Sequence, residues 1–448
     1  MAKTLSEIVG PQNIDDTSSQ TILYSVDGAA PKLVLFPGNI EEACEILTLS
    51  WQREESVIPW GNGTKMGWGN IPSKVDWVVC TKRLDRITDC DHENLTVTVE
   101  AGIPFSRVQE RLRSLGRGYS IPLDPPFTQT ATIGGIVATN SSGSRRHLYG
   151  TARDLILGMK VILPNGKQNR WGGKTVKNVA GYDMSKLYIG SFGTLGIITE
   201  VIFRILPLPE RETTFIAVFS EISSPFKAVS GILQSELLPS AIEILNSRVL
   251  EVLGLELFGK DGGIFLAVNF EGFDESVERQ IRQVKEMVRS FEPLSIHFLE
   301  GALQEQFWGG LRNFELIVQP HFPDRISCKV SVPISKTSEV FNLLKEVTHR
   351  MDFDSTLRSH AGSGIVQVDF LVKDLSPERD EFVRTLNEVR ERIKTLEGDL
   401  VIKGAPLSLR KRIDVWGKPG RDFFIMQNVK ALFDPHRLLN PGRFVGGI

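Results

Sequence analysis

Three stretches rich in glycine and other small residues constrain the fold of this chain more than any other feature. They cover residues 59–70, 125–143 and 190–198. The first reads P-W-G-N-G-T-K-M-G-W-G-N and follows a short apolar run, which predicts a loop after a strand. Glycine permits positive φ and lets backbone N–H groups approach an anion closely. We interpret residues 59–70 as a pyrophosphate cradle, and an ordinary surface loop is the alternative for this stretch taken alone.

Two common phosphate-binding motifs do not account for these glycines. The Rossmann fingerprint has to open a helix, whereas residues 71–79 after the first loop are typical of a loop and a strand. The G-G-K-T sequence at residues 172–175 looks like the end of a P-loop, but Gln168 stands where such a loop needs its first glycine. The long second stretch instead predicts a smooth surface for a flat, extended ligand such as an isoalloxazine–ribityl–diphosphate.

The pattern of the chain changes after the sequence L-P-L-P-E at residues 206–210, which predicts the exit from a first domain. Beyond it, the glycine density falls and short strands alternate with helices, which is typical of an α+β domain with an antiparallel sheet. The strands are expected at 215–219, 264–270 and 325–333, and the helices at 226–236, 275–291 and 336–351. We expect a first domain at 1–208, a second at 209–410 and a tail at 411–448 that returns to the first domain.

Composition excludes several classes of protein. The 52 Lys and Arg against 54 Asp and Glu leave a net charge of -2, without the basic footprint of a nucleic-acid binder. We find no signal peptide and no run of about 18 apolar residues, so we expect a cytoplasmic protein and leave peripheral membrane attachment open. The four cysteines form no C-x-x-C and the seven histidines no H-x-x-x-H, so we expect neither a metal site nor an iron–sulfur cluster.

Taken together, the three stretches resemble the FAD-binding domain of the vanillyl-alcohol-oxidase type. Its signs are a P-x-G-x-G-T loop, a proline-led T-x-G-G segment and G-x-x-G-x-L-G-x-I-T, which this chain carries in the same order. The sequence L-F-P-G-N-I-E-E at residues 35–42 and the tail L-N-P-G-R at 439–443 also resemble this family. The resemblance implies an α+β protein, with this FAD-binding domain followed by an antiparallel-sheet cap or substrate domain.

The resemblance also implies which residues bind FAD. Neither of the first two stretches contains His or Cys, the residues that tether flavin in covalent members of the family, so we expect FAD to be bound non-covalently. The residues assigned to the cofactor are Pro59, Trp60, Gly61, Asn62, Gly63, Thr64, Lys65, Gly69, Pro125, Pro126, Thr132, Gly134, Gly135, Thr139, Asn140, Ser142, Gly143, Arg146, Tyr149, Gly150, Gly193, Gly196, Ile197, Ile198 and Asn440.

A narrower resemblance concerns residues 142–158 and 176–187, which are similar to the FAD-binding E subunit of bacterial glycolate oxidase, more properly glycolate dehydrogenase. It implies oxidation of glycolate to glyoxylate, with electrons passing to a partner. The partners implied are a larger FAD-bearing D subunit and an iron–sulfur F subunit. Two alternatives stay open: a stand-alone FAD-dependent D-2-hydroxyacid dehydrogenase of the D-lactate type, and a non-catalytic subunit whose FAD is structural or relays electrons.

A 2-hydroxy acid needs a cation for its carboxylate and a base for its proton. The candidate cations are Arg312 and Arg325, then Lys329 and Arg358, and the candidate base is His360. Either arginine could equally be a surface residue, and the histidine could be structural. The sequence H-A-G-S-G at 360–364 partly resembles the H-x-G-D-G motif of catalytic family members, with Ser in place of Asp and no second His soon after. The metal-bearing version of that motif is therefore not expected, and catalysis by this chain stays open.

Overall fold

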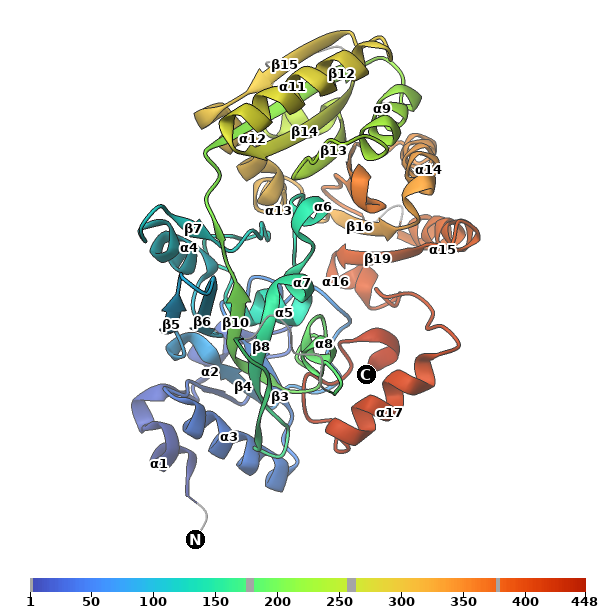
Figure 1. The fold of residues 1–448 in the computed structure, drawn as a ribbon. Coiled ribbons are helices and arrows are strands. Elements are labelled where there is room, and N and C mark those ends of the chain that lie inside the picture. The colour runs from blue at the N-terminus through green and yellow to red at the C-terminus, as the bar shows by residue number, and fades with distance from the viewer. Residues whose placement is uncertain (1–2, 175–180, 256–262, 376–378) are drawn as a thin grey trace. The chain divides into compact units, whose positions relative to one another are not determined.

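The computed structural model describes residues 3–174, 181–255, 263–375 and 379–448, and the chain in it forms two compact units (Figure 1). Unit 1 contains Met1–Ser142, Thr151–Pro207 and Trp416–Ile448, and unit 2 contains Gly143–Gly150 and Leu208–Val415. The predicted boundaries put residues 143–150 in the first domain, whereas in the structure this short stretch belongs to unit 2.

The first sheet of unit 1 places the first glycine-rich stretch. The strands β2, β4 and β3 are parallel, and β1 pairs with β2 in the antiparallel direction at one edge of the sheet. The helix α3 connects β2 and β3. The α3 helix begins after Asn39, whose side chain accepts a hydrogen bond from the Glu42 N–H, and it buries apolar residues against the sheet. The elements are β1 (Ile14–Asp15), β2 (Leu33–Leu35), β4 (Trp77–Cys80), β3 (Val57–Trp60) and α3 (Ile40–Arg53).

The second sheet of unit 1 is antiparallel, in the order β5-β6-β10-β8-β9, and packs against the short helices α4 and α5. The α5 helix begins after Thr132 in the second glycine-rich stretch, and β10 continues the third. The elements are β5 (Ile87–Asp91), β6 (Thr96–Glu100), β10 (Ile197–Arg204), β8 (Ile156–Ile162), β9 (Gln168–Gly172), α4 (Phe105–Arg113) and α5 (Ile133–Thr139).

The C-terminal tail of unit 1 is fixed by one buried lysine. In the helix α17 (Phe423–Phe433, red in Figure 1), Lys430 is the buried residue, at 3% exposure. Its ammonium donates to the carbonyls of Thr194 and Leu439 at 2.8 and 3.0 Å and pairs with Asp434 at 2.6 Å. This one side chain therefore joins the tail to the third glycine-rich stretch.

Unit 2 is built on an eight-stranded antiparallel sheet, in the order β15-β12-β14-β13-β17-β18-β16-β19. The predicted α+β class with an antiparallel sheet is confirmed, because each of the three expected strands and three expected helices overlaps an observed one. The strands are β15 (Ser295–Leu299), β12 (Arg211–Phe219), β14 (Ile264–Gly272), β13 (Ala241–Asn246), β17 (Ser355–His360), β18 (Ile365–Phe370), β16 (Ile326–Ser331) and β19 (Asp399–Gly404).

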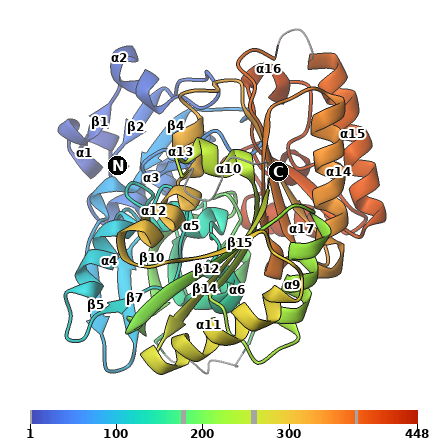
Figure 2. The ribbon, with the colours of Figure 1, turned by 90° about the horizontal axis from the view of Figure 1, so that it is seen from above.

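Helices cover the two halves of this sheet differently. One face carries α9 and α11 over the first half and α14 and α15 over the second (Figures 1 and 2). The other face carries α10, α12 and α13 over the first half, whereas on β17, β18, β16 and β19 it presents mainly polar side chains. The helices are α9 (Ser223–Leu233), α11 (Asp274–Arg289), α14 (Thr337–Arg350), α15 (Arg379–Thr395), α10 (Ser247–Val252), α12 (Gly301–Arg312) and α13 (Phe314–Val318). Over the described ranges, no helix is long and apolar enough to cross a membrane.

Replacing Lys430 by Met tests the tail contact. The change leaves the buried Asp434 carboxylate without its cation, so we expect the free energy of unfolding to fall by about 3–5 kcal/mol. Chemical denaturation measures this loss, and the same change at the exposed Lys167 is the control. A K430M protein as stable as K167M would show that the buried pair does not hold the tail.

Candidate functional site

The three glycine-rich stretches meet in unit 1 around a pocket of about 750 Å³, its open mouth included. Strand β3 leads into the first stretch, α5 grows out of the second, and the third leads into β10. The pocket is lined by Pro59, Trp60, Gly61, Asn62, Gly63, Thr64, Lys65, Met66, Thr81, Thr132, Gly134, Gly135, Ala138, Thr139, Phe192, Gly193, Gly196, Ile197, Ile198, Asn440 and Arg443.

Glycines make room for this pocket, because they have no side chain. A Cβ on Gly61 would lie 2.1 Å from the Thr132 hydroxyl oxygen, and that oxygen is already held because it accepts a hydrogen bond from the Gly135 N–H at 3.3 Å. Gly193 has a φ of +68°, and a Cβ there would lie 3.1 Å from the Pro59 ring. The stretches therefore approach each other as bare backbone, which leaves N–H groups for a ligand.

The charges of the pocket suit an anion. Its lining contains the buried cations Lys65 and Arg443, at 7% and 1% exposure, and no Asp or Glu among the residues given above. The Lys65 ammonium lies 5.9 Å from the ring centre of Trp68, and Arg443 donates to the Met66 carbonyl at 2.7 Å. The side-chain oxygen of Asn440 is buried and accepts no hydrogen bond within the described structure, so it is available to a donor on a ligand.

A second polar constellation lies in unit 2, on the polar face of the sheet. Lys329 of β16 is directly opposite Gln367 of β18, and Gln367 is directly opposite Arg358 of β17. Residues directly opposite each other in an antiparallel pair share a face, so these three side chains form one lateral row. Lys403 belongs to the same face on the edge strand β19, next to β16.

His360 is fixed by two neighbours on this face. Its Nδ1 is hydrogen-bonded to the carboxylate of Glu243, the directly opposite residue on β13, and its Nε2 lies 2.9 Å from the Gln367 amide nitrogen. Glu243 is buried, and an ionised carboxylate can only accept, so the ring carries its proton on Nδ1. The Nε2 atom is then the basic nitrogen, and it accepts from the Gln367 amide.

Two arginines on this face are neutralised by carboxylates. Arg325 pairs with Asp369 at 2.7 Å and with Glu315 at 3.2 Å, and Arg358 pairs with Asp369 at 2.7 Å. Burial alone would raise the pKa of Asp369, but the two guanidinium groups outweigh it and lower the pKa to about 2. Arg358 also stacks on the Phe314 ring at 4.0 Å, so this triad is a fixed part of the sheet.

Comparison with known protein families covers both units. Residues 31–172 match the family described as "FAD binding domain". Residues 208–403 and 415–444 match "FAD linked oxidases, C-terminal domain". The chain belongs to the FAD-linked oxidase family. Its cofactor is FAD, as the sequence predicts, and the chain is a flavin-dependent oxidoreductase.

Relatives of this FAD-linked oxidase match it over nearly its whole length. Glycolate oxidase subunit GlcD of Bacillus subtilis is 30% identical over 98% of this chain and 95% of its own length. A D-lactate dehydrogenase of Anaerostipes hadrus is 27% identical, over 97% and 94%. The expected similarity to a glycolate oxidase flavin subunit is confirmed, although this relative is GlcD, whereas the motifs resembled the E subunit.

Solved structures share the fold. p-Cresol methylhydroxylase matches with a TM-score of 0.78 at 16% identity, over 98% of this chain and 95% of its own. At that identity the likeness shows the fold alone, and it agrees with the predicted α+β class. Residues 176–180 of the second glycolate-oxidase-like motif lie outside the described residues.

The pocket in unit 1 fits FAD. Its bare backbone and two cations suit the pyrophosphate, and the apolar residues among its lining suit the flat ring. Of the residues predicted to bind FAD, those that line the pocket are Pro59, Trp60, Gly61, Asn62, Gly63, Thr64, Lys65, Thr132, Gly134, Gly135, Thr139, Gly193, Gly196, Ile197, Ile198 and Asn440.

Several predicted cofactor residues lie elsewhere. Gly69, Pro125, Pro126, Asn140 and Ser142 belong to unit 1 but are not among the lining residues. The other four are part of unit 2, where the Tyr149 hydroxyl donates to Glu271 and Arg145 pairs with Glu271 at 3.0 Å. Their contact with FAD stays a prediction. The four are Gly143, Arg146, Tyr149 and Gly150.

Five lining residues were not predicted from the sequence. Arg443 could have been, because it ends the L-N-P-G-R tail that resembles the family. Three of the others lie inside the recognised stretches but are apolar, and Thr81 follows β4, outside all three stretches. The four are Met66, Thr81, Ala138 and Phe192.

The predicted catalytic residues are all in unit 2. His360 joins Glu243 and Gln367, as described above. Arg312, at the end of α12, pairs with Glu305 of the same helix at 2.8 Å, and Arg325 is held by Asp369 and Glu315. Both arginines predicted to bind the substrate carboxylate are therefore paired with a carboxylate of the protein itself. In the described part of the chain, no three His, Cys, Asp or Glu residues gather as a metal site.

Replacing Gly61 by Ala tests the pocket. The new Cβ forces Thr132 out of its place, and such overpacking costs roughly 1–3 kcal/mol, so we expect FAD to bind about tenfold more weakly. The control is Gly67→Ala in the same loop, where a Cβ meets nothing within 4 Å. Titration of the apoprotein with FAD measures both affinities. Equal affinities in the two variants would contradict this placement of the cofactor.

Acid precipitation tests whether the flavin is tethered. The pocket lining given above contains no His or Cys, so we expect all yellow colour to stay in the supernatant after the protein is precipitated. The absorbance of pellet and supernatant measures the division. Flavin that remains in the washed pellet would show a covalent bond.

Proposed function

We propose that this FAD-linked oxidase oxidises a small 2-hydroxy acid, with glycolate as the first candidate, to the corresponding 2-oxo acid. The observation that carries the proposal is the polar face of unit 2, where Lys329 lies opposite Gln367 and the Gln367 amide contacts His360. It offers a cation for a carboxylate and a basic nitrogen for a hydroxyl proton. The two relatives, a glycolate oxidase subunit and a D-lactate dehydrogenase, are named for acids of this class.

Oxidation of glycolate breaks one C–H and one O–H bond and forms the C=O of glyoxylate. Bound FAD supplies the acceptor for the hydride that leaves the α-carbon. The hydroxyl proton goes to Nε2 of His360, which exchanges its hydrogen bond from Gln367 for one from the substrate. The charge that develops on the imidazole is balanced by the buried Glu243 carboxylate at Nδ1.

The electrons then leave to a partner. The chain carries no C-x-x-C motif, and one of its relatives is a subunit by name. We therefore propose that this chain works as the flavin subunit of a glycolate-dehydrogenase-type complex, with a second flavin subunit and an iron–sulfur subunit as the partners. Purification from the native cell, with identification of the co-purifying chains and of the cell fraction, tests the partners and the predicted cytoplasmic location together.

The D-lactate dehydrogenase relative favours a second candidate, a stand-alone D-2-hydroxyacid dehydrogenase. Substrate preference and dependence on a partner separate it from the complex. A purified chain that turns over D-lactate better than glycolate with an artificial electron acceptor, and gains nothing from a partner, would favour this alternative.

Anaerobic mixing of the purified chain with glycolate tests the proposed function. We expect the oxidised-flavin absorbance at about 450 nm to disappear, because the chain holds both the flavin pocket and the acid-handling residues. Bleaching only after a partner is added would make the FAD a relay. A flavin that no 2-hydroxy acid reduces, with or without cell extract, would refute the proposal.

Replacing Glu243 by Gln tests the role of His360. The amide no longer balances the imidazolium, so we expect kcat to fall by about 10²- to 10⁴-fold, the range of one general-base effect, while KM changes little. FAD content should equal that of the wild type, because the pocket residues belong to unit 1. If KM instead rose by a similar factor while kcat stayed unchanged, Glu243 would serve binding or structure.

A further inference from the structure

We propose that Lys329 is the group that binds the carboxylate of the substrate, at an anion site that Arg146 and Lys403 complete. The proposal rests on the proposed function for the identity of the acid. It differs from the sequence prediction, in which Arg312 and Arg325 are the first candidates for this task.

Three arginines of unit 2 already have carboxylate partners. Arg325 and Arg358 share the buried Asp369, and Arg312 pairs with Glu305. Binding a substrate carboxylate at any of them would require breaking a short ion pair. Within the described residues, the Lys329 ammonium makes neither a hydrogen bond nor an ion pair. It is therefore a cation on the polar face that a substrate can reach without competing with a protein carboxylate.

The position of Lys329 fits a small acid. It lies opposite Gln367, whose amide contacts Nε2 of His360, so the cation and the base are on either side of one side chain. The strands β16 and β17 are separated only by β18, which places their backbones roughly 10 Å apart. The long lysine side chain and the imidazole shorten that gap from both ends. A two- or three-carbon 2-hydroxy acid can then put its carboxylate on Lys329 and its hydroxyl on His360.

The surroundings of Lys329 favour an anion. Burial, the Arg146 guanidinium and the Lys403 ammonium together lower the pKa of Lys329 to about 8. The positive charges of Arg146 and Lys403 both act on the Lys329 ammonium, and a carboxylate bound to Lys329 offsets that repulsion. The Asp369 triad is different, because its charges compensate each other inside the protein. A structural role therefore accounts for Arg325 but not for Lys329.

Oxalate is a suitable probe, because it carries a carboxylate group of the same kind but no α-hydrogen to transfer. Calorimetric titration of the FAD-loaded protein measures its affinity without turnover. We expect Lys329→Gln to weaken oxalate binding by about 10- to 100-fold, the range of one charge-assisted hydrogen bond. Lys329→Arg, which keeps the charge, should restore most of the affinity.

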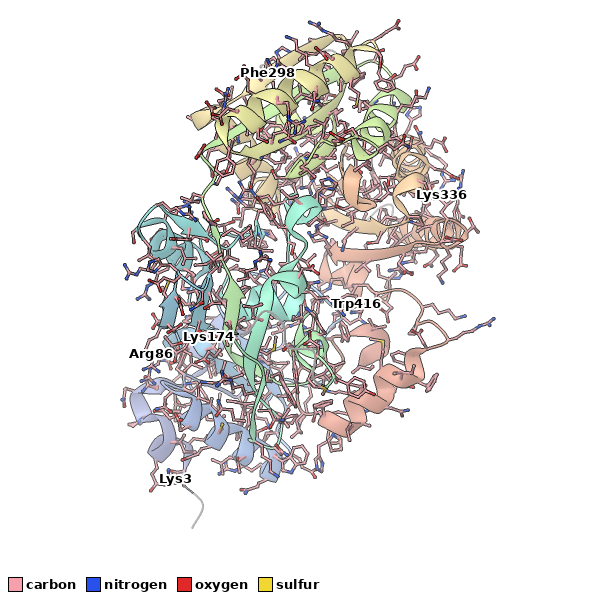
Figure 3. The ribbon with its side chains drawn as sticks, in the orientation of Figure 1. Lys3, Arg86, Lys174, Phe298, Lys336 and Trp416 are labelled. Carbon is pink, nitrogen blue, oxygen red and sulfur yellow. The ribbon has the colours of Figure 1, made fainter. Side chains whose placement is uncertain are left out.

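The matched control is Lys336→Gln, also in unit 2. Lys336 is exposed, pairs with Glu339 at 3.4 Å, and lies on the outer side of the molecule (Figure 3). This variant should bind oxalate like the wild type. A second measurement needs no variant at all. Oxalate should protect Lys329, but not Lys336, from acetylation by a water-soluble active ester, with mass spectrometry as the readout.

Oxalate affinity that is equal in K329Q and the wild type, or acetylation of Lys329 that oxalate does not slow, would overturn the proposal. The experiments distinguish a failure of the anion site from a failure of the proposed function. If that function fails, glycolate does not reduce the flavin, while oxalate still binds in a Lys329-dependent way. If only the anion site fails, glycolate reduces the flavin of K329Q as it does that of the wild type.

Discussion

The close approach of bare backbone in unit 1 is the constraint on which the rest of this structure depends. Gly61 can pass the Thr132 hydroxyl, and Gly196 can pass Val161, only because neither carries a Cβ, which would lie 2.1 and 2.5 Å from those side chains. The pocket therefore forms where glycines let the backbone segments approach each other. Two buried cations, Lys65 and Arg443, then give it the charge that an FAD pyrophosphate needs.

Unit 2 uses one antiparallel sheet for two purposes. Its first half is covered by helices on both faces and serves as a core. Its second half keeps one face polar, and there the ion pairs of Asp369 fix the strands, while His360 and Lys329 lie on the same face. Within the described residues, Arg325 and Arg358 are neutralised by Asp369 and Lys329 makes no ion pair. This difference separates the structural charges from the one proposed to bind substrate.

The sequence predicts the parts of this protein that depend on local chemistry. Glycine-rich loops, the α3 helix after Asn39 and the strands of unit 2 follow from neighbouring residues, and so does the FAD family. The charge pairing could not be predicted. Asp369 neutralises an arginine 44 positions away, and only the pairing of β16 with β18 brings the two together. Sequence proximity likewise placed residues 143–150 with the first domain, whereas long-range contacts such as Tyr149 to Glu271 tie them to unit 2.

We propose above that the flavin of this chain takes a hydride from the α-carbon of a 2-hydroxy acid. Anaerobic stopped-flow reduction of the purified protein, with normal and α-dideuterated glycolate compared at saturation, tests it most directly. We expect clearly slower bleaching with the deuterated acid, because the C–H bond breaks in the step that reduces the flavin. Equal rates with the two acids, or a flavin that stays oxidised in both, would contradict it.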